Sequence, residues 1–358
     1  MSAISEVQPI NKARITRLAS LAVGISILVA FIYFVGLNSL VRVLLQVNPI
    51  VILAMVTVQL LGFALYSTAW YALIRSTDAR LPFLTCQGIT FASIFASYTM
   101  PSGIFLEAVR CILASKESGM TLGESTATVI LHRVLYIVGF LATTSLAFVV
   151  LIFGGRVTTS IVFQLAAVPL LAVAGLIASL FLSLNPKIMQ PLLDRVLRLV
   201  QPVLKILQKQ ARMNGKAGEF LEDYHTTFRR MLSSRMLIAT SFAACLGDWA
   251  CSVLILWVVL VAVGSSVSLW VVLVTGAIGE MIQMTPIAVP GMLGIYETAI
   301  TASLSLFGVP VAVAASAALL SRIVTFWLDL PVAGIAAYHY GYKVIGPTSD
   351  RPNRNQTQ

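Results

Sequence analysis

Long apolar segments constrain the fold of this chain more than any other feature of its sequence. Six of them reach the length of about 20 residues that is needed to cross the hydrocarbon core of a bilayer. They cover residues 18–36, 50–73, 134–153, 159–182, 236–263 and 311–338. Only 11% of the 358 residues are Asp, Glu, Lys or Arg, whereas a soluble domain contains about 25%. The sequence therefore predicts an all-α polytopic membrane protein and excludes an ordinary globular enzyme.

Basic residues are unevenly distributed along the chain. Residues 185–235 form the one extended polar segment and contain ten of the 24 Lys and Arg residues. Because Lys and Arg accumulate on the cytoplasmic side, we expect a multi-pass cell-membrane protein with this segment and both termini, including the polar tail 345–358, in the cytoplasm. The basic surplus is thus interpreted as topology, and no nucleic-acid partner is expected.

Apolar side chains between residues 188 and 207 of that segment recur at helical spacing among basic residues. One interpretation is an amphipathic helix that lies on the anionic surface of the leaflet. The other is a solvated connector that packs on the ends of the membrane helices. Neither interpretation implies a catalytic domain.

Two moderately apolar segments, 81–118 and 269–307, lie between the long ones, and Pro and Gly interrupt each of them. If each long segment crosses the membrane once, both ends of 81–118 lie on the cytoplasmic side. Both ends of 269–307 then lie on the opposite side. We therefore predict two re-entrant helical hairpins that enter the membrane from opposite faces. The predicted turn residues are Pro101, Gly103, Pro286, Pro290, Gly291 and Gly294. These residues allow a tight turn, and they can also expose backbone N–H groups to an anionic head group.

The segments that follow the two hairpins have the same spacing, because 14 residues separate Gly119 from Arg133 and Gly308 from Arg322. Each half then consists of two helices, a hairpin and a long helix. The halves are residues 1–155 and residues 156–344, with 185–235 inserted into the second. Since the halves begin on opposite sides, the sequence predicts inverted repeats, which are typical of secondary transporters.

Each ionisable residue inside the apolar segments calls for a structural or functional explanation, because a charge at the bilayer centre costs about 3 kcal/mol on insertion scales. Arg133 and Arg322 occupy matching positions, and a guanidinium is a planar fork of donors that suits phosphate. The alternatives for both are snorkelling or pairing with Glu107 and Glu297. Glu107 and Arg110 lie on one helical face, where they can neutralise each other. These five residues form the predicted substrate-binding site.

Further acidic residues outnumber Arg322 in the second half of the chain. Buried carboxylates are suitable proton carriers, so we expect proton coupling to involve Glu280, Asp248 and Asp329. His132 is expected to be a packed or hydrogen-bonded side chain. The four cysteines lack the spacing of metal ligands, so neither a metal nor another cofactor is expected.

The motifs at both turns resemble those of the transmembrane, flippase-like region of lysylphosphatidylglycerol synthases. The resemblance rests on Pro101-Ser-Gly-Ile-Phe-Leu-Glu107-Ala-Val-Arg110 and Pro290-Gly-Met-Leu-Gly294-Ile-Tyr-Glu297, each followed by the Gly and Arg described above. It implies an association with the movement of lipids, such as aminoacylated phosphatidylglycerol or polyprenyl-linked species, between leaflets. Ser102 stands where a Gly is more usual in that family. The resemblance also implies that a soluble acetyltransferase-like domain performs the aminoacylation in full-length synthases. Only residues 347–358 follow the last helix in this sequence, so we expect no lipid aminoacylation by this chain alone.

These observations favour a flippase or transporter for a phospholipid or polyprenyl-linked anionic lipid, with Arg133 and Arg322 at its phosphate. The alternatives are a membrane enzyme that acts on a lipid phosphate and an accessory subunit of a glycosyltransferase. Catalysis is not expected, since the sequence contains no recognised catalytic motif. The expected partners are a membrane lipid or lipid-linked substrate and, for 185–235, the anionic leaflet surface; oligomers are compatible with the sequence.

Overall fold

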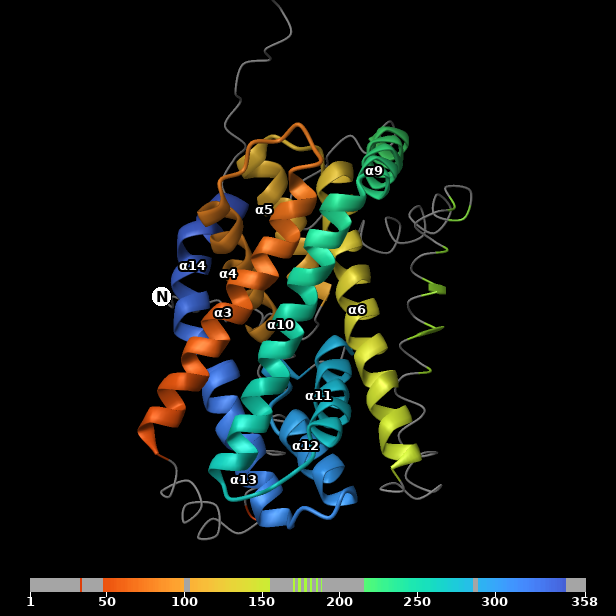
Figure 1. Cartoon of the computed structure of the whole chain (residues 1–358). Coiled ribbons are helices and arrows are strands. Elements are labelled where there is room, and N and C mark those ends of the chain that lie inside the picture. Colours follow the sequence, from red (N-terminus) through yellow and green to blue (C-terminus); the bar gives the residue numbers. More distant parts are fainter. Residues whose placement is uncertain are drawn as a thin grey trace, which may run out of the picture.

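The computed structural model describes residues 48–99, 104–154, 216–285 and 289–345, with a few single positions outside these ranges. Every regular element within these ranges is a helix (Figure 1). The helices are α3 (Pro49–Ile74), α4 (Phe83–Thr99), α5 (Ile104–Ser118), α6 (Leu122–Phe153), α9 (Lys216–Ser233), α10 (Arg235–Ala262), α11 (Leu269–Met284), the 3-10 turn η1 (Pro290–Met292), α12 (Ile295–Leu306), α13 (Val311–Arg322), the π-helix η2 (Ile323–Trp327) and α14 (Asp329–Ile345). The prediction of an all-helical chain is confirmed for this part of the molecule.

Four helical segments of the described part are long and apolar enough to cross a membrane, so the chain is an integral membrane protein. They are α3, α6, α10 and the segment Val311–Tyr340, which α13, η2 and α14 form together. They correspond to four of the six predicted spans. The other two predicted spans, 18–36 and 159–182, lie outside the described residues apart from single positions, as do the predicted leaflet helix and the polar tail.

Helix α6 begins 12 residues earlier than the predicted span 134–153, because a capping box fixes its first turn. The Thr121 side chain accepts a hydrogen bond from the Glu124 backbone, and the Glu124 side chain accepts one from the Thr121 backbone. This reciprocal pairing satisfies two donors that a helix start otherwise leaves unpaired. As a result His132 and Arg133 lie inside a 32-residue helix.

Two pairs of short helices occupy opposite ends of the bundle, with α4 and α5 in the upper half of Figure 1 and α11 and α12 in the lower half. The helices of each pair are separated where Pro and Gly interrupt the sequence, after Thr99 and after Met284. The predicted turn residues Pro101, Gly103 and Pro286 lie outside the described residues. The predicted positions of both helix breaks are thus confirmed.

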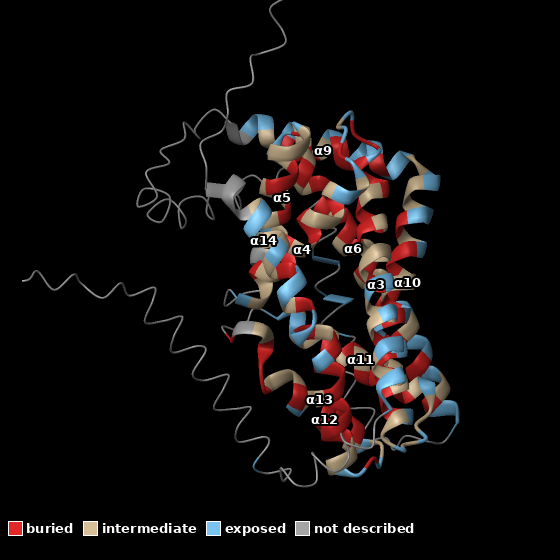
Figure 2. Cartoon of the chain, turned by 90° about the vertical axis from the view of Figure 1, so that its left-hand side faces the viewer, coloured by how far each residue is buried: buried red, intermediate tan, exposed pale blue. Residues whose placement is uncertain are grey.

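The packing between the two halves of the chain is reciprocal. The first short helix of the first half, α4, packs on α14 of the second half, and α11 of the second half packs on α6 of the first. The long helices α3 and α10 also pack side by side (Figures 1 and 2). Small residues allow this contact, since a Cβ on Gly247 would lie 2.9 Å from the Leu65 Cδ1 atom. Close backbone approach at glycine is a usual way for membrane helices to associate.

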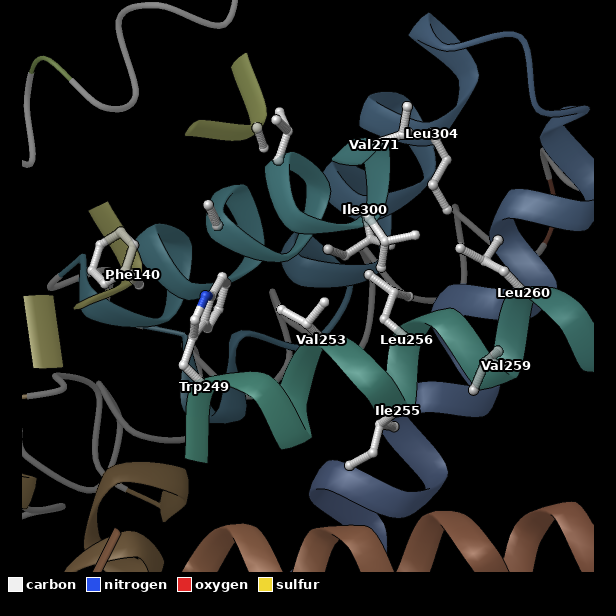
Figure 3. Close-up of a cluster of buried hydrophobic side chains, with 14 of the residues drawn as sticks. Phe140, Trp249, Val253, Ile255, Leu256, Val259, Leu260, Val271, Ile300 and Leu304 are labelled. Atoms are coloured by element: carbon white, nitrogen blue, oxygen red, sulfur yellow. The ribbon is translucent and has the colours of Figure 1, made fainter. Parts of the chain in front are cut away.

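The largest buried apolar cluster of the described residues joins α10, α11, α12 and α13 to α3 and α6. Figure 3 shows part of it, with Val253 and Leu256 of α10 next to Ile300 of α12. Large apolar side chains also cover the outer faces, as on α3, where Leu53 is 67% exposed and Leu60 is 52% exposed. Apolar side chains that are exposed in this way suit a bundle surrounded by lipid.

Helix α9 lies at the same end of the bundle as α5 (Figure 1). Its side chains Leu221, Tyr224, Phe228 and Met231 are buried, and the last three pack in one cluster with residues of α3 and α6. At Gly123 of α6, a Cβ would lie 2.4 Å from the Phe220 carbonyl oxygen. The two helices therefore touch along their backbones, and α9 is an integral part of this end of the fold.

Candidate functional site

A cavity of about 240 Å³ lies between the two pairs of short helices. Its wall is formed by both pairs together with α3, α6, α10, α13 and the π-helix η2. The polar side chains that line it come from nine elements and are Gln59, Tyr66, Ser97, Tyr98, Glu107, Arg133, Tyr136, Asp248, Ser252, Glu280, Gln283, Tyr296, Ser321 and Thr325. A polar cavity within a bundle whose outer faces are apolar is the arrangement expected of a substrate pathway.

Arg133 brings a positive charge to this cavity from the middle of α6. Its side chain is 28% exposed, and its Nε lies 3.8 Å from Oε1 of Glu107. The two groups form an ion pair, but the separation is too long for a hydrogen bond. The guanidinium therefore faces the cavity with donors that Glu107 does not occupy.

Arg110, in contrast, lies behind Glu107 and is completely buried. Its Nη1 donates to Oε2 of Glu107 at 3.2 Å and to the Tyr66 hydroxyl at 2.9 Å. Its Nη2 is 3.2 Å from Nδ1 of His132, which must accept because a guanidinium can only donate. The guanidinium carbon is also 4.3 Å from the ring centre of Trp70, within the range of a cation–π interaction. Arg110 is held on several sides and does not line the cavity.

Arg322 is also buried, in a cluster that holds the second pair of short helices. Its Nε donates to Oε1 of Glu297 at 3.1 Å, and both side chains are 2% exposed. Its Nη2 donates to the Gly291 carbonyl oxygen. The other carboxylate oxygen of Glu297 accepts from the Gly294 backbone at 2.7 Å. One ion pair therefore fixes the connection between α11 and α12 at two backbone positions.

That connection requires glycine at Gly291. Its φ is +60°, and a Cβ there would lie 2.4 Å from Cε2 of Phe326. Gly294 also has a positive φ, of +78°. Gly291 lines the cavity, so the ion pair and the glycine together place backbone at its wall. Pro290 begins the 3-10 turn at this point.

The three acidic residues predicted for proton coupling are divided between two places. Asp248 of α10 and Glu280 of α11 line the cavity. Asp329 does not line it, but its Oδ2 accepts a hydrogen bond of 2.8 Å from Gln59, which does. Asp329 is thus linked to the cavity through one amide side chain.

The structure brings Glu107 and Arg133 to one cavity and separates Arg110, Glu297 and Arg322 from it as buried polar groups. His132 is buried and hydrogen-bonded, as expected from the sequence. We did not predict the neutral polar residues of the cavity wall, which include four tyrosines and two glutamines. The signal that could have found them is an uncharged polar side chain in the otherwise apolar segments of α3 and α11, at Gln59 and Gln283.

The π-helix η2 was also missed. It lies directly after Arg322, and the backbone carbonyl of its Thr325 accepts a hydrogen bond of 3.0 Å from the Tyr98 hydroxyl of α4. A π-helix loosens the regular hydrogen-bond ladder and is often found at functional sites. Here it brings Thr325 to the cavity wall.

Comparison with known proteins agrees with this description. A family model described as the lysylphosphatidylglycerol synthase TM region matches residues 17–333. Two UPF0104 membrane proteins of Methanothermobacter thermautotrophicus are 24% and 21% identical to the chain, over 86% and 89% of it and 89% and 94% of the relatives. A UPF0104 membrane protein of Pyrococcus horikoshii is 20% identical, over 87% of the chain and 94% of the relative. Because the family model matches most of the chain, including both pairs of short helices, the protein belongs to the family of the lysylphosphatidylglycerol synthase TM region.

Proposed function

We propose that the protein moves a lipid with an anionic head group between the leaflets, and that the head group passes through the cavity between the two pairs of short helices. The observation that carries this proposal is Arg133, a guanidinium with 28% of its side chain exposed at a cavity inside a membrane bundle. Ionisable groups in such a position mark substrate pathways. A guanidinium also matches the planar geometry of a phosphate oxygen pair.

The two matching arginines have different roles in this proposal. Arg133 contacts the lipid phosphate, and Glu107 lines the cavity next to it without a hydrogen bond to the guanidinium. Arg322 holds the connection between α11 and α12 through Glu297 and Gly291. Its burial and its occupied donors support a structural role in place of the phosphate contact that we predicted from the sequence.

Proton coupling is the second part of the proposal. Asp248 and Glu280 line the cavity together with Arg133. A carboxylate that takes up and releases a proton in this position changes the charge of the cavity and thereby its attraction for an anionic head group. We propose that Asp329, which accepts a hydrogen bond from Gln59 at the cavity wall, is a third carboxyl group that takes up and releases a proton.

The architecture that we propose consists of two inverted repeats with re-entrant hairpins. Three observations support it: the two pairs of short helices occupy opposite ends of the bundle (Figure 1), α4 and α11 pack reciprocally on the long helix of the other half, and Gly119 and Gly308 adopt nearly the same φ, +78° and +84°. Opposed broken helices around a central site occur in many secondary transporters. Both termini are cytoplasmic in this arrangement.

Reconstitution tests the function. The purified chain is placed in vesicles that contain phosphatidylglycerol with a fluorophore on one acyl chain, and an impermeant quencher reports the lipid that reaches the outer leaflet. We expect faster leaflet exchange than in protein-free vesicles, with the lipid chemically unchanged by mass spectrometry. A modified lipid would support the membrane enzyme. No exchange of phosphatidylglycerol or of a polyprenyl phosphate would contradict the proposal. The remaining alternative would then be an accessory subunit of a glycosyltransferase.

A further inference from the structure

Arg110 has no counterpart in the second half of the chain, although the residues around it do. Arg133 corresponds to Arg322 in the common spacing of the two halves, and Glu107 corresponds to Glu297 with an offset of one residue. The residue three positions after Glu297 is Ile300, which is completely buried in the apolar cluster. The first half thus contains one carboxylate and two guanidiniums where the second half contains one of each.

The extra guanidinium changes how the matching pairs are arranged. In the second half, Glu297 and Arg322 form a hydrogen-bonded pair at 3.1 Å, and the pair is sealed from the cavity. In the first half, Glu107 is bonded to Arg110 at 3.2 Å and stands 3.8 Å from Arg133. The Oε1 atom of Glu107, which is nearest to Arg133, accepts no hydrogen bond within the described residues. Arg110 therefore satisfies Glu107 from behind, on the side away from the cavity.

We infer that Arg110 is a positioning residue that engages Glu107 and so keeps the Arg133 guanidinium available for an anion in the cavity. Charge supports this reading, since Glu107, Arg110 and Arg133 together carry a net charge of one positive unit, whereas Glu297 and Arg322 cancel. The surroundings of Arg110 hold it in place: Tyr66 and His132 accept its hydrogen bonds, and the Trp70 ring lies 4.3 Å from its guanidinium carbon. Without it, Glu107 would be free to pair with Arg133 as Glu297 pairs with Arg322.

This inference deepens the proposed function, because it takes Arg133 as the group that meets the lipid phosphate. It also makes a claim about Arg133 that does not depend on any lipid. Phenylglyoxal reacts with accessible arginines whose guanidinium is not held in hydrogen bonds, and peptide mass spectrometry measures the reaction at Arg133 alone. The test therefore uses two measurements on the full chain: the rate of Arg133 modification, and the binding of short-chain phosphatidylglycerol to the detergent-solubilised protein.

In the Arg110→Leu variant, Glu107 loses its partner and pairs with Arg133. We expect Arg133 modification and lipid binding to fall about tenfold, the size expected for one charge-assisted contact. Adding Glu107→Gln to that variant removes the competing carboxylate, and both measurements should return to within about threefold of the parent protein, since a neutral amide does not form that contact. A purely structural role of Arg110 predicts no such rescue, so a double variant that is as impaired as Arg110→Leu overturns the inference.

The single variant Glu107→Gln keeps the inference testable if Arg110→Leu does not fold. Because Arg133 is already available in the parent protein, Glu107→Gln should change the rate of Arg133 modification less than about twofold, well below the effect of losing a charge-assisted contact. A many-fold increase would show that Glu107 holds Arg133 in the parent protein, and would overturn the inference. If the modification rates agree but phosphatidylglycerol does not bind to the parent protein, the inference about Arg110 stands and the proposed function fails.

Discussion

Arg110, Arg133 and Arg322 carry the same guanidinium group but lie in different surroundings. Arg110 and Arg322 are buried among partners, whereas Arg133 faces the cavity. Their positions in the sequence predicted which acidic residues they meet, Glu107 and Glu297. Which arginine stays exposed depends on packing around each pair. The sequence could not show that, because the deciding partners of Arg110, Tyr66 and His132, come from other helices.

The buried pair of Glu297 and Arg322 should show strong non-additivity. Removing one partner in Arg322→Met leaves a buried charge unpaired, and we expect a loss of about 3–5 kcal/mol in the free energy of unfolding. The double variant Glu297→Leu with Arg322→Met removes both charges and should be more stable than Arg322→Met alone. Unfolding by SDS in mixed micelles measures both. A double variant that loses the sum of the single losses would contradict the close coupling seen here.

Gly291 should tolerate substitution less than Gly308, although both have a positive φ. A side chain costs about 1–2 kcal/mol in that backbone conformation at either position. At Gly291 a Cβ also collides with Phe326, whereas at Gly308 nothing lies within 4 Å. We therefore expect Gly291→Ala to lower the free energy of unfolding more than Gly308→Ala in the same assay. Equal losses would show that the ring of Phe326 moves aside.

At the scale of elements, the sequence predicted the positions of both helix breaks because Pro and Gly act locally. The breaks after Thr99 and Met284 fall where expected. The start of α6 was predicted 12 residues too late, since charged residues at its centre were taken as its boundary and the capping box of Thr121 and Glu124 was overlooked. The π-helix η2 was not predicted, because Pro331, which follows its last residue by four positions and lacks an N–H donor, was not taken into account.

Helix α9 should be held less firmly at acidic pH. Arg230 of α9 donates two hydrogen bonds to Asp78 in the loop after α3, and this contact lowers the pKa of the Asp78 carboxyl below its usual value. A lowered pKa means that the stabilisation is complete above the pKa of the unfolded chain, about 4, and is lost as the pH falls through the lower folded value. Both side chains are exposed, so the effect is small and is screened by salt.

The measurement for this contact compares the parent protein with Asp78→Asn between about pH 6 and pH 3, a window that includes the ordinary carboxyl pKa. The parent should be the more stable protein at pH 6, and the difference should disappear toward pH 3. Arg230→Gln serves as the matched control and should show the same loss. A difference that grows as the pH falls would contradict the assignment.

At the scale of the whole molecule, the equal spacing of Gly and Arg predicts that the two halves of the chain correspond, segment by segment. Sequence spacing cannot show how the helices pack. The structure shows that α4 packs on α14 and that α11 packs on α6. The cavity itself was not predictable in detail. Its polar side chains come from nine elements, and several of them, such as Tyr136, lie in apolar segments that give no local sign of a site.

The proposed topology predicts labelling from opposite sides. Leu122 and Val311 begin the long helices after the two hairpins and are about half exposed. In intact cells, an impermeant maleimide should label Val311→Cys and should label Leu122→Cys only after permeabilisation. Asp78→Cys, which is 88% exposed in the loop before α4, is the cytoplasmic control. Labelling of Leu122→Cys in intact cells would exclude a re-entrant first hairpin.

The central claim is that a lipid head group passes the cavity at Arg133. Its most direct test is the initial rate of leaflet exchange of acyl-labelled phosphatidylglycerol in vesicles that contain Arg133→Gln. The account predicts a rate at least about tenfold below that of the parent protein, because one charge-assisted phosphate contact is lost. The matched control Arg230→Gln removes an exposed arginine outside the cavity and should exchange lipid at the parent rate. Exchange at the parent rate by folded Arg133→Gln would contradict the account.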